Sequence, residues 1–275
     1  MAELHAPAPV GAVIDELADT WRSIASVARS LPPQGWAAQT DLPGWTVKDV
    51  LSHVAATESM LLGRDEPEHI APSLDHVRNP LGEWNEQRVD LRRSWTESAV
   101  LEEFDGSTRE REAVMRALTS DELQETIASP LGVMPLGQFL RVRLIDSWLH
   151  EQDVRRAVRL PETLDTRAAT RVLDAVLEWL PRAVAKAGFD EGEAAVVEVT
   201  GPVPRRSAAV VRGGRGAAVE DTEAPRLIIR AGCGPFLRAA TGRLAPSEAI
   251  GAGLIDVDGD AALAARLLHE VNRLP

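Results

Sequence analysis

Residues 144–157 read "LIDSWLHEQDVRRA", and the spacing of their apolar side chains predicts the middle of a long helix over residues 136–159. Asp146 and His150 are four residues apart in this stretch, so a helix places both side chains on one face. The other side of the helix is apolar and is formed by Leu140, Leu144, Ile145, Trp148 and Leu149. The stretch therefore predicts a helix that presents a carboxylate and an imidazole together.

The sequence before this helix also has helical periodicity. Residues 10–30 predict a first helix that stops before two prolines, and residues 46–62 predict a second one after a Pro43-Gly44 turn. Thr46 and Asp49 have capping-box spacing at its start. Further helices are predicted over 81–96 and over 107–118, the latter capped by Ser107 and Glu110, with loops at 66–81 and 128–135. Residues 1–160 are therefore predicted to be an all-helical bundle with antiparallel neighbours.

The second half of the chain changes character. A helix is predicted over 165–187, ending at Gly188, and short β-type runs follow at "AAVVEVT" (194–200), "SAAVVR" (207–212) and "PRLIIRAG" (225–232). Helical patterns return at 234–243 and 259–274, with "GLIDVDG" (253–259) a strand between them. We expect residues 161–275 to form a small α+β domain with an antiparallel sheet, so the whole chain is of the α+β class.

The composition excludes several classes of protein. Hydrophobic residues make up 44% of the 275 residues and charged residues 26%, which is typical of folded proteins. The net charge of −12 argues against binding to nucleic acid or to an anionic membrane. The chain lacks an apolar run of the roughly 18–20 residues that span a bilayer, and its N-terminus lacks the pattern of a signal peptide. A cytoplasmic protein is expected.

Cysteine usage narrows the possible chemistry. Cys233 is the only cysteine, so an intramolecular disulfide and a cysteine-rich metal site are both excluded. It lies between two glycines, where we expect a small residue in a tight turn. The glycine-rich "RGGRG" lacks the strand and helix context of a phosphate-binding loop, so a nucleotide site is not expected.

A histidine on the second predicted helix raises the possibility of a metal site. His53 lies on or beside the apolar stripe of that helix. Two histidines and a carboxylate are typical ligands of a catalytic divalent cation with an open position, and Fe²⁺, Mn²⁺, Ni²⁺ and Co²⁺ accept the same donors as Zn²⁺. Asp49 or Asp153, each about one turn from a histidine, could accept a hydrogen bond from the outer ring nitrogen. Spacing alone does not show that His53 meets Asp146, so an ordinary surface pair remains an alternative.

Three stretches resemble one known family. "LPGWTVKDVLSHVAATESMLLGR" (42–64), "LIDSWLHEQDVRRAVRLP" (144–161) and "ATGRLAPSEAIGAGLIDVDGDAALAARLLHEVN" (240–272) are similar to the mycothiol-dependent maleylpyruvate isomerase family. The resemblance implies a DinB-like four-helix bundle followed by an SCP2-like domain, with a metal bound by His53, Asp146 and His150. The founding isomerases have glutamate in a Glu-x-x-x-His pattern where this chain has Asp146, a side chain one methylene shorter.

The resemblance also implies a reaction. A thiolate of mycothiol bound to the metal, most simply Zn²⁺, would attack a small electrophile, and the enzyme would act either as an isomerase or as an S-transferase. The transferase is favoured because it demands less of the unknown substrate. Arg88 and Arg143 are candidates to bind an acidic group of the thiol or substrate, and Arg243 in "TGRLAP" is a candidate catalytic residue. The oligomeric state is left open.

Two other functions are compatible with the same residues. A metal-dependent hydrolase would use metal-bound water, with Asp49, Glu58 or Asp153 tried as general base. A non-catalytic protein would bind a small apolar molecule or lipid in the C-terminal domain.

Two further histidines, His69 and His76, fall in a proline-rich loop and are expected to be exposed to solvent.

Overall fold

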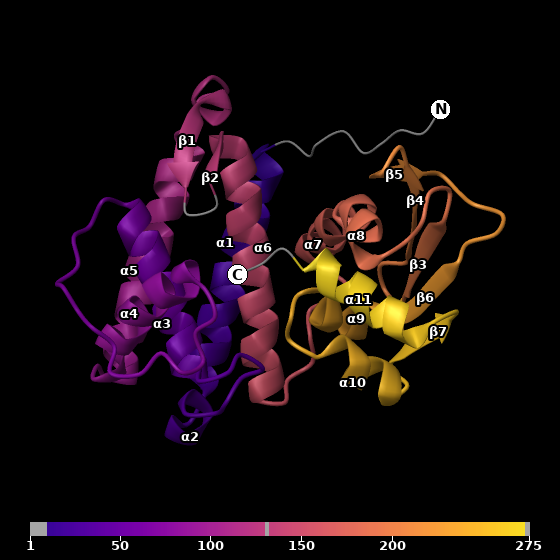
Figure 1. Cartoon of the computed structure of the whole chain (residues 1–275). Helices are drawn as coiled ribbons and strands as arrows, with labels where there is room; N and C mark the ends of the chain where they lie inside the picture. Colours follow the sequence, from indigo (N-terminus) through magenta and orange to yellow (C-terminus); the bar gives the residue numbers. More distant parts are fainter. Residues whose placement is uncertain (1–9, 130–131, 273–275) are drawn as a thin grey trace. The chain divides into compact units, whose positions relative to one another are not determined.

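A computed structural model describes residues 10–129 and 132–272, which form a helical unit up to residue 162 and a sheet-containing unit from residue 163 (Figure 1). The mixture of helix and sheet confirms the α+β class. Among the described residues, no helix combines the length and the apolar character needed to cross a membrane.

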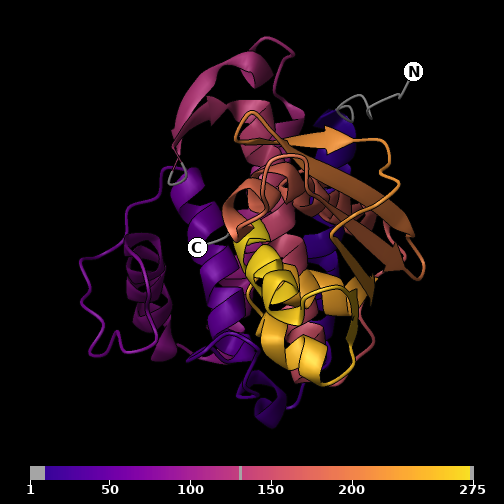
Figure 2. The same cartoon turned by 45° about the vertical axis from the view of Figure 1, so that its right-hand side comes forward.

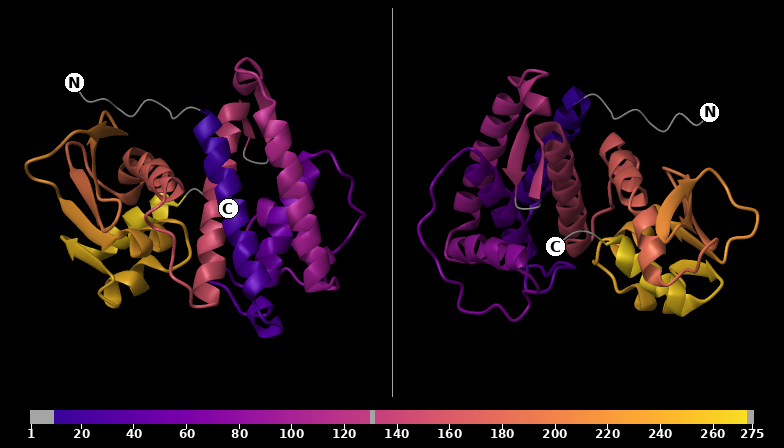
Figure 3. Two further views of the ribbon diagram at one scale, coloured as in Figure 1. Left: turned by 180° about the vertical axis from the view of Figure 1, so that it is seen from behind. Right: turned by 45° about the horizontal axis from the view of Figure 1, so that its top comes forward.

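The helical unit is a four-helix bundle with an additional helix on one side (Figure 3). Its four members are α1 (Val10–Ser30), α3 (Val47–Leu61), α5 (Glu97–Arg116) and α6 (Leu136–Ala157). Both α1 and α3 contact α5 and α6, which closes the bundle, while α4 (Pro80–Arg93) packs against α3. The short α2 (Pro33–Trp36) connects α1 to α3. Apolar side chains with essentially no exposure fill the interior, including Leu17, Ile24, Leu51, Phe104, Leu140 and Leu144.

The start of α3 confirms the predicted capping box. The Thr46 hydroxyl accepts from the backbone N–H of Asp49, and the Asp49 carboxylate accepts from the backbone N–H of Thr46. Two of the N–H groups that a helix leaves unpaired at its beginning are thereby satisfied. Gly44 precedes the cap with a φ of 79°, a left-handed conformation that suits glycine. Its Cα faces the ring of His76, which an added Cβ would approach to 2.9 Å.

Two predictions within the bundle are wrong. Ser107 does not begin a helix: it lies buried inside α5, whose N-cap is Thr96, with the Thr96 hydroxyl accepting from the N–H of Ala99. Thr96, eleven residues earlier, is also a favourable N-cap residue and therefore starts the helix first. The predicted loop at 128–135 contains part of an antiparallel hairpin formed by β1 (Thr126–Ser129) and β2 (Gly132–Pro135), which follows the 3₁₀ turn Glu122–Gln124.

The second unit is built on a five-stranded sheet with strand order β5-β4-β3-β6-β7 (Figure 2). The strands are β3 (Ala194–Thr200), β4 (Arg205–Arg212), β5 (Arg215–Val219), β6 (Leu227–Gly232) and β7 (Ile255–Asp258). All neighbouring pairs are antiparallel except β3 and β6, which are parallel. The predicted antiparallel sheet is therefore wrong at one pair, β3 and β6: β3 to β5 form an antiparallel meander, and β6 returns to the other side of β3.

The first helical segment of the second unit differs from the prediction in its interior but not at its end. The helix expected over 165–187 is divided into α7 (Arg167–Leu177) and α8 (Leu180–Ala187), and Pro181 lies in the first turn of α8. Proline lacks a backbone N–H and is tolerated at a helix start rather than in its interior. The predicted end is confirmed, because Gly188 has a φ of 99° at the C-cap.

The last three helices are α9 (Cys233–Ala240), α10 (Pro246–Gly251) and α11 (Ala261–Val271). Cys233 is the first residue of α9 and is buried, rather than part of a tight turn as expected. Helix α8 packs against α11 and against β4 and β5. Its Pro181 carbonyl approaches Gly216 of β5 so closely that a Cβ there would lie 1.6 Å from the oxygen, which explains the glycine.

Candidate metal centre

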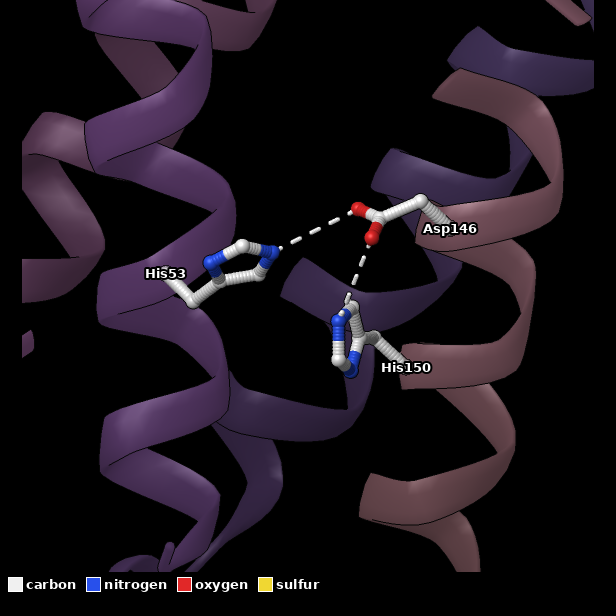
Figure 4. A group of neighbouring side chains, drawn as sticks. All are labelled: His53, Asp146 and His150. Carbon is white, nitrogen blue, oxygen red and sulfur yellow. Dashed lines mark ion pairs between the residues drawn. The ribbon is translucent and has the colours of Figure 1, made fainter. Parts of the chain in front are cut away.

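Three side chains from two helices meet inside the bundle (Figure 4). His53 projects from α3, while Asp146 and His150 project from α6. His53 Nε2 lies 3.5 Å from Asp146 Oδ2, and His150 Nε2 lies 3.5 Å from Asp146 Oδ1. One possible ligand atom of each residue lies within 4.8 Å of the others. The structure thus brings together the three residues that the sequence singled out as metal ligands.

Burial and donor type fit a divalent cation. Both imidazoles are buried, whereas the Asp146 side chain is 27% exposed, so solvent reaches the group of three from the carboxylate side. Two imidazole nitrogens and one carboxylate oxygen are a common donor set for a cation that keeps a fourth position open. The geometry can therefore hold a divalent cation; the assignment of these residues as ligands is a proposal developed below.

A buried carboxylate holds the outer nitrogen of one histidine. His150 Nδ1 lies 3.2 Å from Asp153 Oδ2, and Asp153 in turn accepts from Arg156 at 2.5 Å. Asp153 is completely buried. Such a contact fixes the ring orientation and leaves Nε2 directed toward Asp146. Asp49, the other expected acceptor, instead takes hydrogen bonds from Thr46 and Arg93.

A buried arginine contacts the carboxylate from the other side. Arg143 Nη1 donates to Asp146 Oδ2 at 2.9 Å, and Arg143 Nε donates to Glu58 Oε1 at 2.8 Å. Glu58 is fully buried and also accepts from Arg111 Nε at 3.1 Å. Arg143 was predicted from the sequence to bind an acidic group of a small molecule. In the structure its guanidinium lies between two carboxylates of the protein, those of Glu58 and Asp146.

These neighbours shift the proton affinities of the site residues. Burial alone would raise the pKa of Asp146, but Arg143 and the two histidines outweigh it and hold that pKa well below its ordinary value. Burial also opposes a charge on His150, yet Asp146 and Asp153 together raise its pKa. For His53, burial dominates over the attraction of Asp146 and lowers the pKa. The two histidines therefore differ in protonation tendency.

Trp45 is a site residue that the sequence did not single out. Its ring centroid lies 5.2 Å from that of His53 and 6.1 Å from that of His150. The indole N–H donates to Glu86 Oε2 at 2.8 Å, and Glu86 is completely buried. Trp45 is itself buried, so it covers part of both imidazoles. Its position eight residues before His53, directly before the N-cap of the same helix, was the available signal.

The prediction that the loop histidines His69 and His76 are exposed to solvent is wrong. His76 Nε2 lies 2.9 Å from Glu86 Oε2, and His69 Nε2 lies 2.6 Å from Asp90 Oδ2. Their side chains retain only 22% and 29% exposure. The loop between α3 and α4 is therefore attached to α4 by two histidine–carboxylate contacts, and one of these carboxylates also fixes Trp45.

The remaining candidate residues lie at different places. Arg88 belongs to α4, where its Nε is 3.1 Å from Glu66 Oε2 and its guanidinium lies 3.5 Å from the centre of the Trp84 ring. Arg243 belongs to the second unit, between α9 and α10, and donates to the carbonyl of Thr241. Their expected roles with thiol or substrate stay predictions.

Comparisons with known proteins agree with the resemblance noted in the sequence. A family model described as "Mycothiol maleylpyruvate isomerase N-terminal domain" matches residues 17–155, about half of the chain. A crystal structure of a point mutant of the mycothiol-dependent maleylpyruvate isomerase is similar over 91% of this chain and 93% of its own, with 14% identity and a TM-score of 0.59. The corresponding structure without the substitution covers 86% and 90%, with 15% identity and a TM-score of 0.58. At this identity the likeness shows the fold.

A third solved structure is similar to the C-terminal part alone. It is the sterol carrier protein 2 like 2 from Aedes aegypti, which matches 35% of this chain and 94% of its own, with 17% identity and a TM-score of 0.28. No curated protein matches the sequence.

Proposed function

Because this chain belongs to the mycothiol maleylpyruvate isomerase family, we propose that it is an enzyme that uses a divalent cation and mycothiol to attack a small electrophile. The observation that carries the proposal is the meeting of His53, Asp146 and His150 in the part of the chain that the family model matches. The mycothiol-dependent isomerases that share the fold support the choice of thiol.

The donor set supports the metal part of the proposal. His53, Asp146 and His150 would be the ligands, and Zn²⁺ is the cation we propose because two imidazoles and one carboxylate suit it. A divalent cation at this position would supply positive charge that lowers the pKa of a thiol beside it, which is how a weak nucleophile becomes a strong one at neutral pH.

The protein's own residues would prepare the site for an anionic thiol. Asp153 holds His150 with Nε2 directed inward, and Arg143 holds Asp146 on the opposite side. One carboxylate does not neutralise a divalent cation, so a thiolate is favoured over a neutral ligand. Trp45 covers the two imidazoles and limits the access of water there. The partly exposed Asp146 marks the side from which thiol and substrate would enter.

Of the two possible outcomes, we favour S-transfer. Transfer requires only the addition of the thiol to the electrophile. Isomerisation requires addition of the thiol across a double bond, rotation about the single bond that results, and elimination of the thiol to form the double bond again. Arg88 stays our candidate for binding an acidic group of the thiol or of the electrophile, and Arg243 our candidate catalytic residue. The conjugate formed by the purified protein from mycothiol and a panel of electrophiles, identified by mass spectrometry, distinguishes the two reactions.

The proposed function is tested first by metal analysis and calorimetric titration with mycothiol. We expect about one divalent cation per chain and loss of thiol binding after treatment with a chelator. His53→Ala should lose both the metal and the thiol, while His69→Ala, which removes a histidine–carboxylate contact outside the group of three, should retain both. A fully loaded and active His53→Ala protein would contradict the assignment. Turnover without any thiol would instead indicate a hydrolase.

A further inference from the structure

Four charged side chains of alternating sign form a continuous row through the bundle and end at the candidate metal centre. In order they are Arg111 of α5, Glu58 of α3, and Arg143 and Asp146 of α6. The first three are buried, with 7%, 0% and 5% exposure. Charged groups are rarely placed so deeply unless they are paired, because each loses its hydration. The row therefore calls for a reason beyond the filling of space.

The two arginines and two carboxylates of the row do not form separate one-to-one pairs. Glu58 already contacts Arg111 through Oε2, yet its Oε1 also contacts Arg143, so one carboxylate serves two guanidinium groups. The excess positive charge of Arg143 is directed at Asp146, where Nη1 lies 2.9 Å from Oδ2. Arg143 Nη2 lies 2.7 Å from Glu58 Oε1 as an ion pair without hydrogen-bond geometry. Contacts with carboxylates on both sides hold the guanidinium in place.

The two oxygens of Asp146 consequently differ. Oδ2 accepts a hydrogen bond from Arg143 and lies 3.5 Å from His53, whereas Oδ1 lies 3.5 Å from His150. A hydrogen bond to a guanidinium withdraws negative charge from the carboxylate and prevents its rotation. An oxygen without that bond retains more of its capacity to bind a cation.

We propose that Arg143 is a positioning residue that reserves Oδ2 of Asp146 and keeps the centre electropositive, so that Asp146 offers a cation mainly Oδ1 and only part of its charge. Glu58 sets the strength of this effect by neutralising part of Arg143. The inference rests on the proposed metal site. Its consequence is a cation that is bound less tightly but retains more of its charge for an anionic thiol.

The proposal predicts opposite effects for two members of the same ion pair. Arg143→Met removes a positive charge next to Asp146, so cation affinity should rise, by about tenfold for charges this close in a partly buried site. Glu58→Gln leaves Arg143 less neutralised, so affinity should fall by about the same factor. If the row served only to hold the helices together, both substitutions would disturb Asp146 and both would lower the affinity.

Arg111→Met is the matched control. It removes a buried arginine from the same Glu58 carboxylate, and in the structure Arg111 reaches Glu58 whereas Arg143 reaches Asp146 as well. We expect its cation affinity to change by less than about threefold, because its charge is farther from the ligand atoms. The measurement is titration of the metal-free full-length proteins with Co²⁺, followed by visible absorption, after circular dichroism shows that each variant is folded.

The Co²⁺ spectrum supplies a second readout that does not depend on affinity. A carboxylate that binds through one oxygen favours four-coordinate Co²⁺ with strong visible absorption, and binding through both oxygens raises the coordination number and weakens it. We expect the strong spectrum in the unsubstituted protein and a weaker one in Arg143→Met, where Oδ2 is released. If Arg143→Met does not fold, Arg143→Lys replaces it. The ammonium keeps the positive charge but lacks the planar fork that holds Glu58 and Asp146 together, so the same changes should then be smaller.

The outcomes separate this inference from the proposed function. If the unsubstituted protein binds Co²⁺ but Arg143→Met and Glu58→Gln both bind it more weakly, or both bind it unchanged, the positioning role is wrong while the metal site stands. If the unsubstituted protein binds no Co²⁺, or His53→Ala binds it equally well, the metal site itself is wrong and both proposals fail.

Discussion

Replacement of Asp153 by asparagine tests how strongly the buried carboxylate supports the candidate centre. Asp153 is completely buried and lies 3.2 Å from His150 Nδ1. Loss of such an outer partner usually lowers metal affinity by about 10- to 100-fold, or roughly 1.4–2.7 kcal/mol. Here Arg156 lies closer to Asp153, at 2.5 Å, and already neutralises part of its charge. We therefore expect Asp153→Asn to lower the metal affinity by about tenfold, the lower end of this range.

The same substitution should change the pH dependence of cation binding. A cation must displace the proton of His150, so affinity falls by about tenfold per pH unit below the folded-state pKa of that residue. Burial lowers this pKa, but Asp146 and Asp153 raise it above the ordinary value of 6.5, so the fall should begin above that pH. Without the Asp153 charge, one of the raising interactions is lost and the fall should begin at lower pH.

The metal-free protein provides an independent check of the sign. A raised folded-state pKa means that the charged His150 stabilises the fold fully below about pH 6.5, and that this stabilisation disappears as pH rises through the raised value. Denaturant unfolding at several pH values, in the presence of a chelator, should show this loss, and it should be smaller in Asp153→Asn.

The assay is competitive titration with a chromophoric chelator between pH 5.5 and about 8.5, a window that brackets the ordinary histidine pKa. Asp90→Asn is the matched control, because Asp90 also contacts one histidine and one arginine, His69 and Arg93, outside the group of three. An Asp153→Asn protein with the affinity and the pH dependence of the unsubstituted protein would show that Asp153 does not act on the centre, as would an equal effect of Asp90→Asn.

Three further substitutions test the folds of the two units. Thr46→Ala removes the hydroxyl that accepts from the backbone N–H of Asp49 and donates to its carboxylate, and should lower the free energy of unfolding by about 1 kcal/mol, measured with denaturant. Gly44→Ala should cost about 1–2 kcal/mol in the same measurement, since φ is 79° and the new Cβ would lie 2.9 Å from the His76 ring; unchanged stability would mean that this turn differs from the one described. Leu173→Ala, at a position with 0% exposure in the second unit, should destabilise by about 2–5 kcal/mol, and a thermal unfolding curve identical to that of the parent would argue against a packed core there.

Local patterns predicted the parts of the site that lie within one or two helical turns. The spacing of Asp146 and His150 required only that residues 136–159 be helical, and α6 spans Leu136–Ala157. The capping box of Thr46 and Asp49 likewise depends on residues three apart. Local patterns did not predict where α5 begins. Ser107 and Thr96 are both favourable N-cap residues, and only the complete helix shows that Thr96 is the one used.

Local sequence patterns could not predict contacts between residues that are far apart in the chain. Periodicity placed His53 on a face of its helix, but bundle packing determined that this face meets Asp146. The same holds for Arg143. Its sequence position is compatible with a charge exposed on the surface, but in the structure it lies between Glu58 and Asp146. The parallel pairing of β3 with β6 also joins segments about thirty residues apart, whereas their local patterns are compatible with either direction.

The sequence by itself therefore determined most helices of the bundle, the α+β class and the two ligand candidates on α6, because hydrogen bonds and side-chain spacing within a few residues decide them. Tertiary structure alone decided that His53 completes the group of three, that Trp45 covers it, and that Asp153 and Arg143 hold its members from opposite sides. These contacts depend on which helix faces pack together, and that choice is made by the burial of the whole core rather than by any short stretch of chain.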